Sequence, residues 1–401
     1  MPITNLNAIP RFALPYSLAD TFAAVGSLFR DRIPAPDPFR ELLGEGVYFW
    51  TASGRQALWL TLRALNLKPN CGVAIPLFND LSISTAVAGA GCRPVYIDIE
   101  ERTLNMDPDS LAAARGRFEV VVVGHLFGNV ADLKRIRQAA GSAPLIEDTV
   151  HAPLSRLDGR DVGHSGVACF HSFASTKYWP AGGGGLLIVR DTPLACRVRE
   201  EVRVLQRQSP AAEWKNLFLQ TAKAIVFSRA LYGVAGLPFR AWAESRAILE
   251  PALSFKQVQR HQAAVAIRQA LRFRERVRRQ RENSLYLLSL LERAEDIVLP
   301  REWPGAQYNY HLFTILAADT KERNAIAATM LRHGVDTSRI WHNIVDHCRR
   351  LGYTGGCPAA ESVPGRMMTL PNYASLSRKD MDRVARVFLS ALREHRSNRC
   401  R

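Results

Sequence analysis

The stretch SFASTKYWPAGGGG, residues 172–185, decides how the rest of the sequence is interpreted. It places Lys177 between a serine-rich turn and four consecutive glycines. Glycine lets a backbone turn sharply and approach other segments closely. An ordinary surface lysine does not need such a setting, whereas a lysine amine that must reach a buried electrophile does. The stretch therefore makes Lys177 a candidate catalytic residue, with a plain turn between two strands as the alternative.

The sequence around this stretch alternates between strand-like and helix-like runs. Buried strands alternating with helices predict an α/β fold with a mainly parallel central sheet and helices on both faces. Ligands of such sheets gather beyond the carboxyl ends of the strands. The predicted strands are VAIPLF (73–78), PVYIDI (94–99), FEVVVVGHLFG (118–128), APLIED (143–148), GVACFHSF (166–173) and GGGLLIVR (183–190).

Downstream of residue 190 the pattern changes twice. Residues 192–250 read as a helical insert, and 214–242 is a mostly apolar stretch with a Gly-Pro break at 236–238. This stretch could pack in a dimer interface, cap the active site or make peripheral contact with a membrane surface. From about residue 300 the runs predict a smaller α+β domain. We therefore predict a large cofactor-binding domain at 1–250, followed by a long helix and a small C-terminal domain at 251–401.

Composition narrows the class of protein. The 401 residues carry a net charge of +16, which favours anionic partners. The arginine-rich stretch 268–282 reads as part of a solvated helix, and the sequence holds no nucleic-acid-binding signature, so we expect no nucleic-acid partner. Seven scattered cysteines without a CxxC pair predict a cytoplasmic protein with no zinc or other metal site. The first residues lack the features of a signal peptide.

Three residues near the lysine complete a candidate site. Asp148 ends the strand LIED, where a carboxylate faces the ligand crevice, although a helix cap also explains an acid there. His151 follows shortly after, and Ser172 precedes the lysine loop. A lysine that forms a Schiff base, with an acid that pairs with a protonated pyridine nitrogen, is the chemistry of pyridoxal phosphate (PLP) enzymes. The helix-opening turn TASGRQAL (51–58) supplies amides and hydroxyls for the phosphate.

The motifs resemble, in order and spacing, those of the DegT/DnrJ/StrS family of sugar aminotransferases. The resemblance covers most of the chain and implies PLP-dependent transferase fold type I, the aspartate aminotransferase fold. The segments that carry it are SGRQALWLTLRAL (53–65), GHLFGNVADL (124–133), EDTVHA (147–152), CFHSFASTKYWPAGGGGLLIV (169–189), QAAVAIRQAL (262–271), YHLFTIL (310–316) and MMTLPNYASLSRKDMDRV (367–384).

The resemblance implies a role for each candidate residue. Lys177 is expected to bind the cofactor covalently and to carry the proton, while Asp148 pairs with the pyridine nitrogen. His151 is expected at the oxygen side of the ring. The expected phosphate ligands are Ser172 and the backbone amides of Gly54 and Arg55. The implied reaction, by a homodimer, moves an amino group from an amino acid, commonly glutamate, to a nucleotide-linked keto sugar in glycan or antibiotic synthesis.

The chain departs from the family pattern at several positions. Arg55 stands where the family has a phosphate-binding threonine, and either replaces that hydroxyl or points elsewhere. Asp80 occupies the place of the aromatic residue that stacks on the ring, and Phe78 is the candidate substitute. Residues 254–260 lack the asparagine that reaches the partner subunit's phosphate, and 192–250 is longer than usual.

These departures keep two alternatives open. One is a PLP-binding regulatory or scaffold protein that uses the basic helix and the apolar insert for contacts with a partner or a membrane. The other is a PLP enzyme with diverted chemistry, dehydration or elimination. Relatives with that chemistry lack the lysine present here at position 177, which favours aminotransfer.

Overall fold

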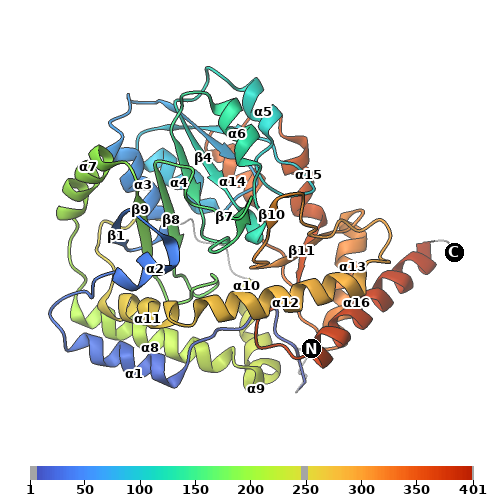
Figure 1. Ribbon diagram of the computed structural model, residues 1–401. Helices are drawn as coiled ribbons and strands as arrows, with labels where there is room; N and C mark the ends of the chain where they lie inside the picture. Colours follow the sequence, from blue (N-terminus) through green and yellow to red (C-terminus); the bar gives the residue numbers. More distant parts are fainter. Residues whose placement is uncertain (1–6, 245–251, 400–401) are drawn as a thin grey trace.

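The computed structural model describes residues 7–244 and 252–399, and its centre is a seven-stranded sheet (Figure 1). Strands β3, β2, β4, β5 and β8 run parallel to one another, and β9 is antiparallel to both β8 and β1. The predicted α/β fold with a mainly parallel sheet is confirmed. The strand order is β1 (Val47–Thr51), β9 (Gly185–Val189), β8 (Ala168–Ser172), β5 (Leu145–Asp148), β4 (Val120–Gly124), β2 (Gly72–Pro76) and β3 (Arg93–Ile97).

Helices cover both faces of this sheet because its strands are apolar on both faces. Every residue of β2, β4 and β5 is buried, as near-continuous apolar runs predict. Alternate residues pack in opposite directions: Val73 and Val120 contribute to one core cluster, Ala74 and Val121 to another. The first cluster includes α3 (Gly54–Ala64), α4 (Leu81–Gly89) and α7 (Thr192–Arg203), and the second α5 (Pro108–Ala113) and α6 (Leu133–Ala140).

A layer of N-terminal and central helices covers the end of the sheet formed by β1, β9 and β8. Its core joins the strands through apolar contacts, and the rings of Trp179 and Phe273 stack with centroids 3.8 Å apart. The elements of this layer are α1 (Leu18–Leu28), η1 (Asp37–Phe39), α2 (Arg40–Leu43), α8 (Pro210–Val226), α11 (Arg260–Ala270) and the start of α12 (Phe273–Leu291).

The insert is mainly helical from 192 to 244, as predicted, and the helix type changes at the predicted 236–238 break, in addition to a break after Val226. After α8 ends at Val226, a short α9 (Arg229–Leu231) and the π-helical turn η3 (Tyr232–Gly236) lead into α10 (Leu237–Glu244). Pro238 therefore lies in the first turn of a helix, where its missing N–H breaks no intrahelical hydrogen bond. No helix within 7–244 or 252–399 is long and apolar enough to cross a membrane.

The arginine-rich stretch 268–282 forms the end of α11 and the first half of α12. Two of its arginines make exposed ion pairs with an acid one turn away, Arg278 with Glu275 at 2.8 Å and Arg279 with Glu275 at 2.6 Å. These pairs are those of a solvated helix, and each contributes little to stability.

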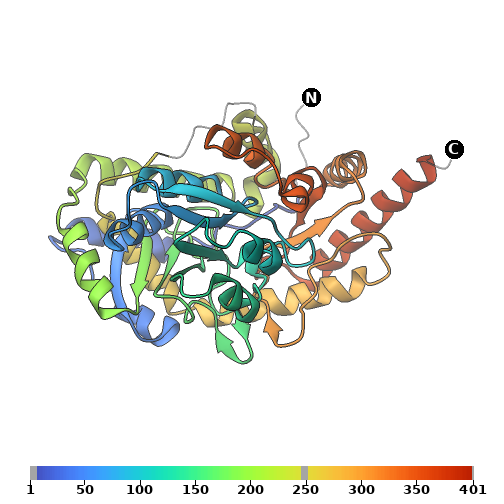
Figure 2. The ribbon, with the colours of Figure 1, turned by 90° about the horizontal axis from the view of Figure 1, so that it is seen from above.

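The C-terminal part has a core of its own, which α12 joins to the central sheet (Figure 1). Strands β11 (Phe313–Leu316) and β12 (Met367–Leu370) pair antiparallel, and α16 (Arg378–Arg399) extends away from the sheet (Figure 2). The predicted boundary at 250/251 lies outside the described residues, so the two-domain division stays a prediction. The remaining elements are β6 (Arg156–Leu157), β7 (Arg160–Asp161), η2 (Leu126–Gly128), β10 (Ala306–Gln307), α13 (Thr320–Arg332), α14 (Ile344–Arg350) and α15 (Pro358–Arg366).

Candidate active site

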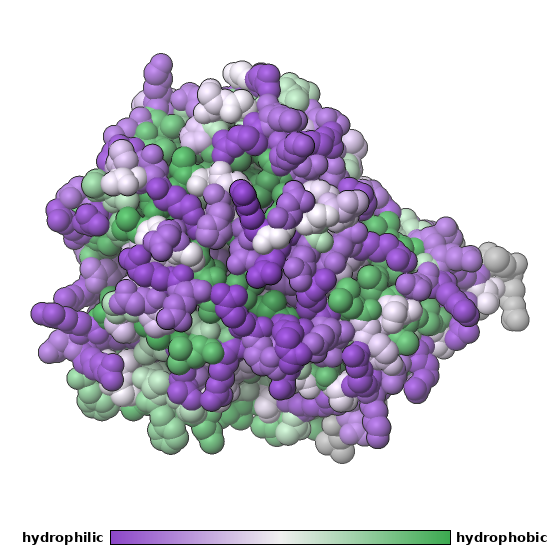
Figure 3. Space-filling model, in the orientation of Figure 1, coloured by the Kyte–Doolittle hydropathy of each residue, from purple (hydrophilic) through white to green (hydrophobic). Residues whose placement is uncertain are grey.

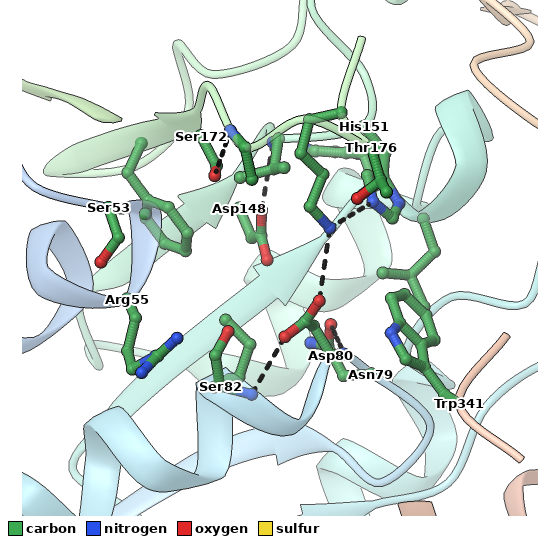
Figure 4. A pocket seen from close by; sticks show the side chains of 18 residues that line it. Ser53, Arg55, Asn79, Asp80, Ser82, Asp148, His151, Ser172, Thr176 and Trp341 are labelled. Carbon is green, nitrogen blue, oxygen red and sulfur yellow. Dashed lines mark hydrogen bonds and ion pairs between the residues drawn. The ribbon is translucent and has the colours of Figure 1, made fainter. Parts of the chain in front are cut away.

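A cavity lies beyond the carboxyl ends of the parallel strands, where the fold predicts a ligand (Figure 4). Asp148 is the last residue of β5 and Ser172 the last of β8, and both line this cavity. The structure brings six of the seven predicted site residues here: Gly54, Arg55, Asp148, His151, Ser172 and Lys177.

Phe78 is the exception. Its side chain is fully buried and packs against the rings of Phe127 and Trp341, with centroids 6.1 and 5.4 Å away. It is not among the residues that line the cavity. The structure therefore corrects its predicted place at the cofactor ring: an apolar core that this ring fills holds it away from the ligand.

The glycines after the lysine allow two loops to meet. Gly183 has a φ of 145°, and a side chain there would meet Gln262 Nε2 at 2.4 Å. A Cβ at Gly185 would come within 2.8 Å of the Gly54 nitrogen. The lysine loop consequently packs directly against the start of α3, which is why this stretch needs glycine.

Two side chains hold the Lys177 amine. Nζ lies 3.0 Å from His151 Nε2 and 3.3 Å from Asp80 Oδ2, and Figure 4 shows Asp80 and His151 converging on it. Asp80 also caps α4 by accepting a hydrogen bond from the Ser82 N–H. Burial would raise the pKa of Asp80, but the Lys177 charge and the bonds from Ser82 outweigh it and lower the pKa to about 2. An ionised carboxylate therefore stays beside the amine.

The neighbouring acids Glu147 and Asp148 have opposite environments because successive strand residues face opposite sides of a sheet. Glu147 accepts hydrogen bonds from the backbone N–H groups of Gly163, Ser165 and Gly166. Burial raises its pKa, but the hydrogen bond and charge of His125, with the bonds from Gly163 and Gly166, lower it overall. Asp148 faces the cavity, where burial raises its pKa to about 6 in spite of a bond from the Val150 N–H. Of the two, Asp148 is the acid that a cationic ligand group would stabilise.

His151 is held in one orientation. The Phe127 N–H donates to Nδ1, so the proton of the neutral ring lies on Nε2, 3.0 Å from Lys177 Nζ. This N–H donates to the amine only when the amine is neutral, because a charged ammonium accepts no hydrogen bond. Burial, with the charges of Lys177 and His311, holds the pKa of His151 well below its ordinary value. The Trp341 ring stacks on His151 with an interplanar angle of 6°.

The sequence-based analysis missed Asp80 as a partner of the lysine, and it gave no role to Trp341 or His311. Trp341 lines the cavity, and the His311 ring lies 4.8 Å from that of His151. Trp341 and Phe127 both have positive φ, 53° and 62°. Such backbone strain in bulky residues clusters at functional sites. His311 lies inside the YHLF motif of the family resemblance, and that motif was the sequence signal that could have identified it as a site residue.

The start of α3 forms the other end of the cavity. Ser53 caps this helix by accepting a hydrogen bond from the Gln56 N–H. Arg55 donates to the carbonyl of Ala252, while its Nε is buried and lacks a hydrogen-bond partner within the described ranges. Gln56 donates to the Ser254 carbonyl, so the segment around 252–256 lies against this helix start. Across 7–244 and 252–399, no group of three or more metal-ligating side chains could hold an ion.

Comparisons with known proteins identify relatives of the chain. The chain is 26% identical over 344 residues to a pleiotropic regulatory protein of Geobacillus stearothermophilus (83% of this chain, 81% of that protein). It is 27% identical over 351 residues to a UDP-N-acetyl-3-dehydro-alpha-D-glucosamine 3-aminotransferase of Acidithiobacillus ferrooxidans (85% and 83%).

Solved structures show the same fold. The aminotransferase TlmJ from Streptoalloteichus hindustanus superposes with a TM-score of 0.78 at 24% identity (96% of this chain, 99% of that one). The PLP-form of Spr1654 from Streptococcus pneumoniae superposes with a TM-score of 0.74 at 19% identity (96% and 99%). The model of the DegT/DnrJ/EryC1/StrS aminotransferase family matches residues 37–389. The chain therefore belongs to this family and is an aminotransferase-family enzyme.

Proposed function

We propose that the chain is a PLP-dependent aminotransferase that moves an amino group from an amino acid, glutamate being the predicted donor, to a nucleotide-linked keto sugar. The observation that carries this proposal is the shared cavity in which the Lys177 amine and the Asp148 carboxylate lie at the carboxyl ends of the strands. The reaction exchanges the donor's amine for the sugar's carbonyl oxygen, so the products are a keto acid and an amino sugar.

The residues present fit the cofactor. Asp148 is a buried acid with a raised pKa that a pyridinium nitrogen would satisfy. At the other end of the cavity, the first amides of α3, with Ser172 and the unpartnered Nε of Arg55, suit a phosphate. When bound, PLP supplies the electron sink that makes the donor's Cα proton removable.

Each residue then has a defined task. Lys177 Nζ is the amine that attaches the cofactor and afterwards moves the proton. Asp80 keeps a negative charge beside that nitrogen, and the Nε2 N–H of His151 would donate to a cofactor oxygen. Trp341 fixes the His151 plane. This division of work leaves Asp80 in the place of the stacking aromatic that the family pattern expects.

The sugar substrate is proposed from a second cavity and from the relatives. This cavity shares Asp80, His151 and Lys177 with the first and continues past the exposed Arg339 and the buried Thr369. A diphosphate would find a cation there, and the net charge of +16 favours such a substrate. The Acidithiobacillus relative is named for a UDP-linked substrate. We further propose that the protein is a cytoplasmic homodimer. Light scattering of the purified protein tests the oligomeric state.

Absorbance spectra of the PLP-saturated protein test the proposal. We expect a visible band that glutamate bleaches and that a nucleotide-linked keto sugar restores. Borohydride reduction and peptide mapping should then find the cofactor on Lys177. A protein that binds PLP on Lys177 but reacts with no amino donor would contradict aminotransfer. It would favour the regulatory function suggested by the name of the Geobacillus relative.

A further inference from the structure

Helices α1 and α8 together expose an unusual number of large apolar side chains. We call the surface formed by their outward side chains the α1–α8 face; its members are Leu18, Phe22, Phe29, Trp214, Phe218 and Ile225. Phe22, Phe29 and Phe218 are between 72% and 78% exposed. The rings of Phe29 and Trp214 make a T-shaped contact, with centroids 6.2 Å apart, which joins the two helices into one surface. Figure 3 shows hydrophobic side chains gathered along the lower left margin, where Figure 1 places α1 and α8.

The acidic side chains of these two helices point away from the α1–α8 face and into the protein. Asp20 is the only carboxylate of α1, and it is buried against Arg268 at 3.1 Å. Glu213 is the only carboxylate of α8, and it is buried against Arg260 at 2.9 Å. The outward sides of both helices are therefore apolar and carry no negative charge.

Cations border this face. Arg32 follows α1 and Arg207 precedes α8, both are exposed, and both line one cavity between the end of α1 and the start of α8. Lys215, on the first turns of α8, is exposed as well. The same cavity is lined by the acid Asp31 and by the ion pair of Glu213 with Arg260, so cations exceed acids there by one. Aromatic and aliphatic side chains with a basic border are the features of helices that lie in a membrane interface.

We propose that the α1–α8 face docks the enzyme on a membrane surface rich in anionic lipids. Phe22, Phe29 and Phe218 enter the boundary of the acyl chains, while Arg32 and Arg207 contact lipid phosphates. A second copy of the chain fits this surface less well, because in a two-fold interface the partner presents the same patch, whose helices carry no outward carboxylate to pair with the arginines. Anionic head groups instead complement them.

Vesicle flotation of the full-length holoenzyme tests the proposal. The protein should float with vesicles of phosphatidylcholine and phosphatidylglycerol, much less with phosphatidylcholine alone, and less as salt rises. We expect the double variant Phe22→Ser/Phe218→Ser to lose about tenfold or more of the vesicle partition. Arg32→Ser/Arg207→Ser should lose the preference for anionic vesicles. The conservative double variant Phe22→Trp/Phe218→Trp should retain binding, and so should Leu285→Ser, which alters an exposed apolar side chain on α12.

Three results would overturn the proposal. The wild-type holoenzyme could fail to float with anionic vesicles. The double serine variant, shown by circular dichroism to be folded, could float as well as the wild type. Light scattering could show that this variant turns a dimer into monomers, in which case the face is a subunit interface.

Discussion

Two regions differ from the usual pattern of apolar side chains inside and polar side chains outside. The cavity around Lys177 buries polar groups, and the α1–α8 face exposes apolar ones. In the cavity, carboxylates are buried, and burial raises the pKa of Asp148 to about 6. On the face, Phe22 and Phe218 are more than 70% exposed. Buried polar groups and exposed apolar clusters are both unfavourable for an isolated chain, and both become favourable when a ligand of matching chemistry arrives. The difference between the two regions indicates the ligand: a small polar cofactor in one, an extended apolar and anionic surface at the other.

Removing the amine gives the largest expected effect in this comparison. Lys177→Ala should lower turnover on the order of 10⁴-fold, because it removes the group that moves the proton. Half-reaction spectra with glutamate measure the loss. Lys223→Ala alters a half-buried lysine on α8 outside the cavity and should react as the wild type does. If the two variants were equally active, Lys177 would have no catalytic role.

The next effect concerns stability without cofactor. The pKa of Asp148 rises from 3.8 to about 6 on folding, so the unfolded chain loses its proton first as pH increases. The buried acid therefore destabilises the fold progressively from about pH 4 to pH 6 and by a constant amount above. Asp148→Asn should gain about 3 kcal/mol of unfolding free energy at pH 8 and almost none below pH 4.

Urea unfolding of the cofactor-free proteins at both pH values measures this difference. The Asn variant should at the same time lose aminotransferase activity. Equal stability of the two proteins at pH 8 would show that the carboxylate is not strained by burial, and the proposed contrast between the regions would fail there.

A smaller kinetic effect is expected at Asp80, where one substitution can remove the ion pair with Lys177 and keep the helix cap. Asp80→Asn keeps a capping residue on α4 but removes the charge 3.3 Å from Lys177 Nζ. The value of kcat/KM should fall about tenfold to a hundredfold, as expected for a charged hydrogen bond of roughly 1.5–3 kcal/mol. Asp107→Asn is the matched control, because Asp107 caps α5 outside the cavity. Equal kinetics of the two variants would contradict a role for this charge.

The smallest effect tests the exposed region. Phe218→Ser should change the free energy of unfolding by no more than about 0.5 kcal/mol, because the ring contributes little to the core. Phe273→Ala, which removes a fully buried ring stacked on Trp179, should cost about 3–5 kcal/mol. Thermal or urea unfolding compares the two. A large loss for Phe218→Ser would mean that this face belongs to the folded core.

Much of the fold could be predicted because its signals are local. Continuous apolar runs mark β2 and β4, and Ser53 marks the start of α3. The ends of successive parallel strands meet at one edge, so Asp148 and Ser172 were expected to lie together. The predicted break at 236–238 coincides with the start of α10 at Leu237, because proline is tolerated in the first turn of a helix. The break after Val226 had no glycine or proline to signal it.

The sequence by itself determined the sheet, the edge that bears the ligand site, and the lysine and aspartate that approach it, because strand periodicity and strand ends are properties of neighbouring residues. Only the tertiary structure decided that Asp80 pairs with an amine 97 positions away, that Phe78 fills a core instead of the cavity, and that α1 and α8 share an apolar face. The reason is that side-chain partners and exposure depend on which distant elements meet, and no local pattern encodes that meeting.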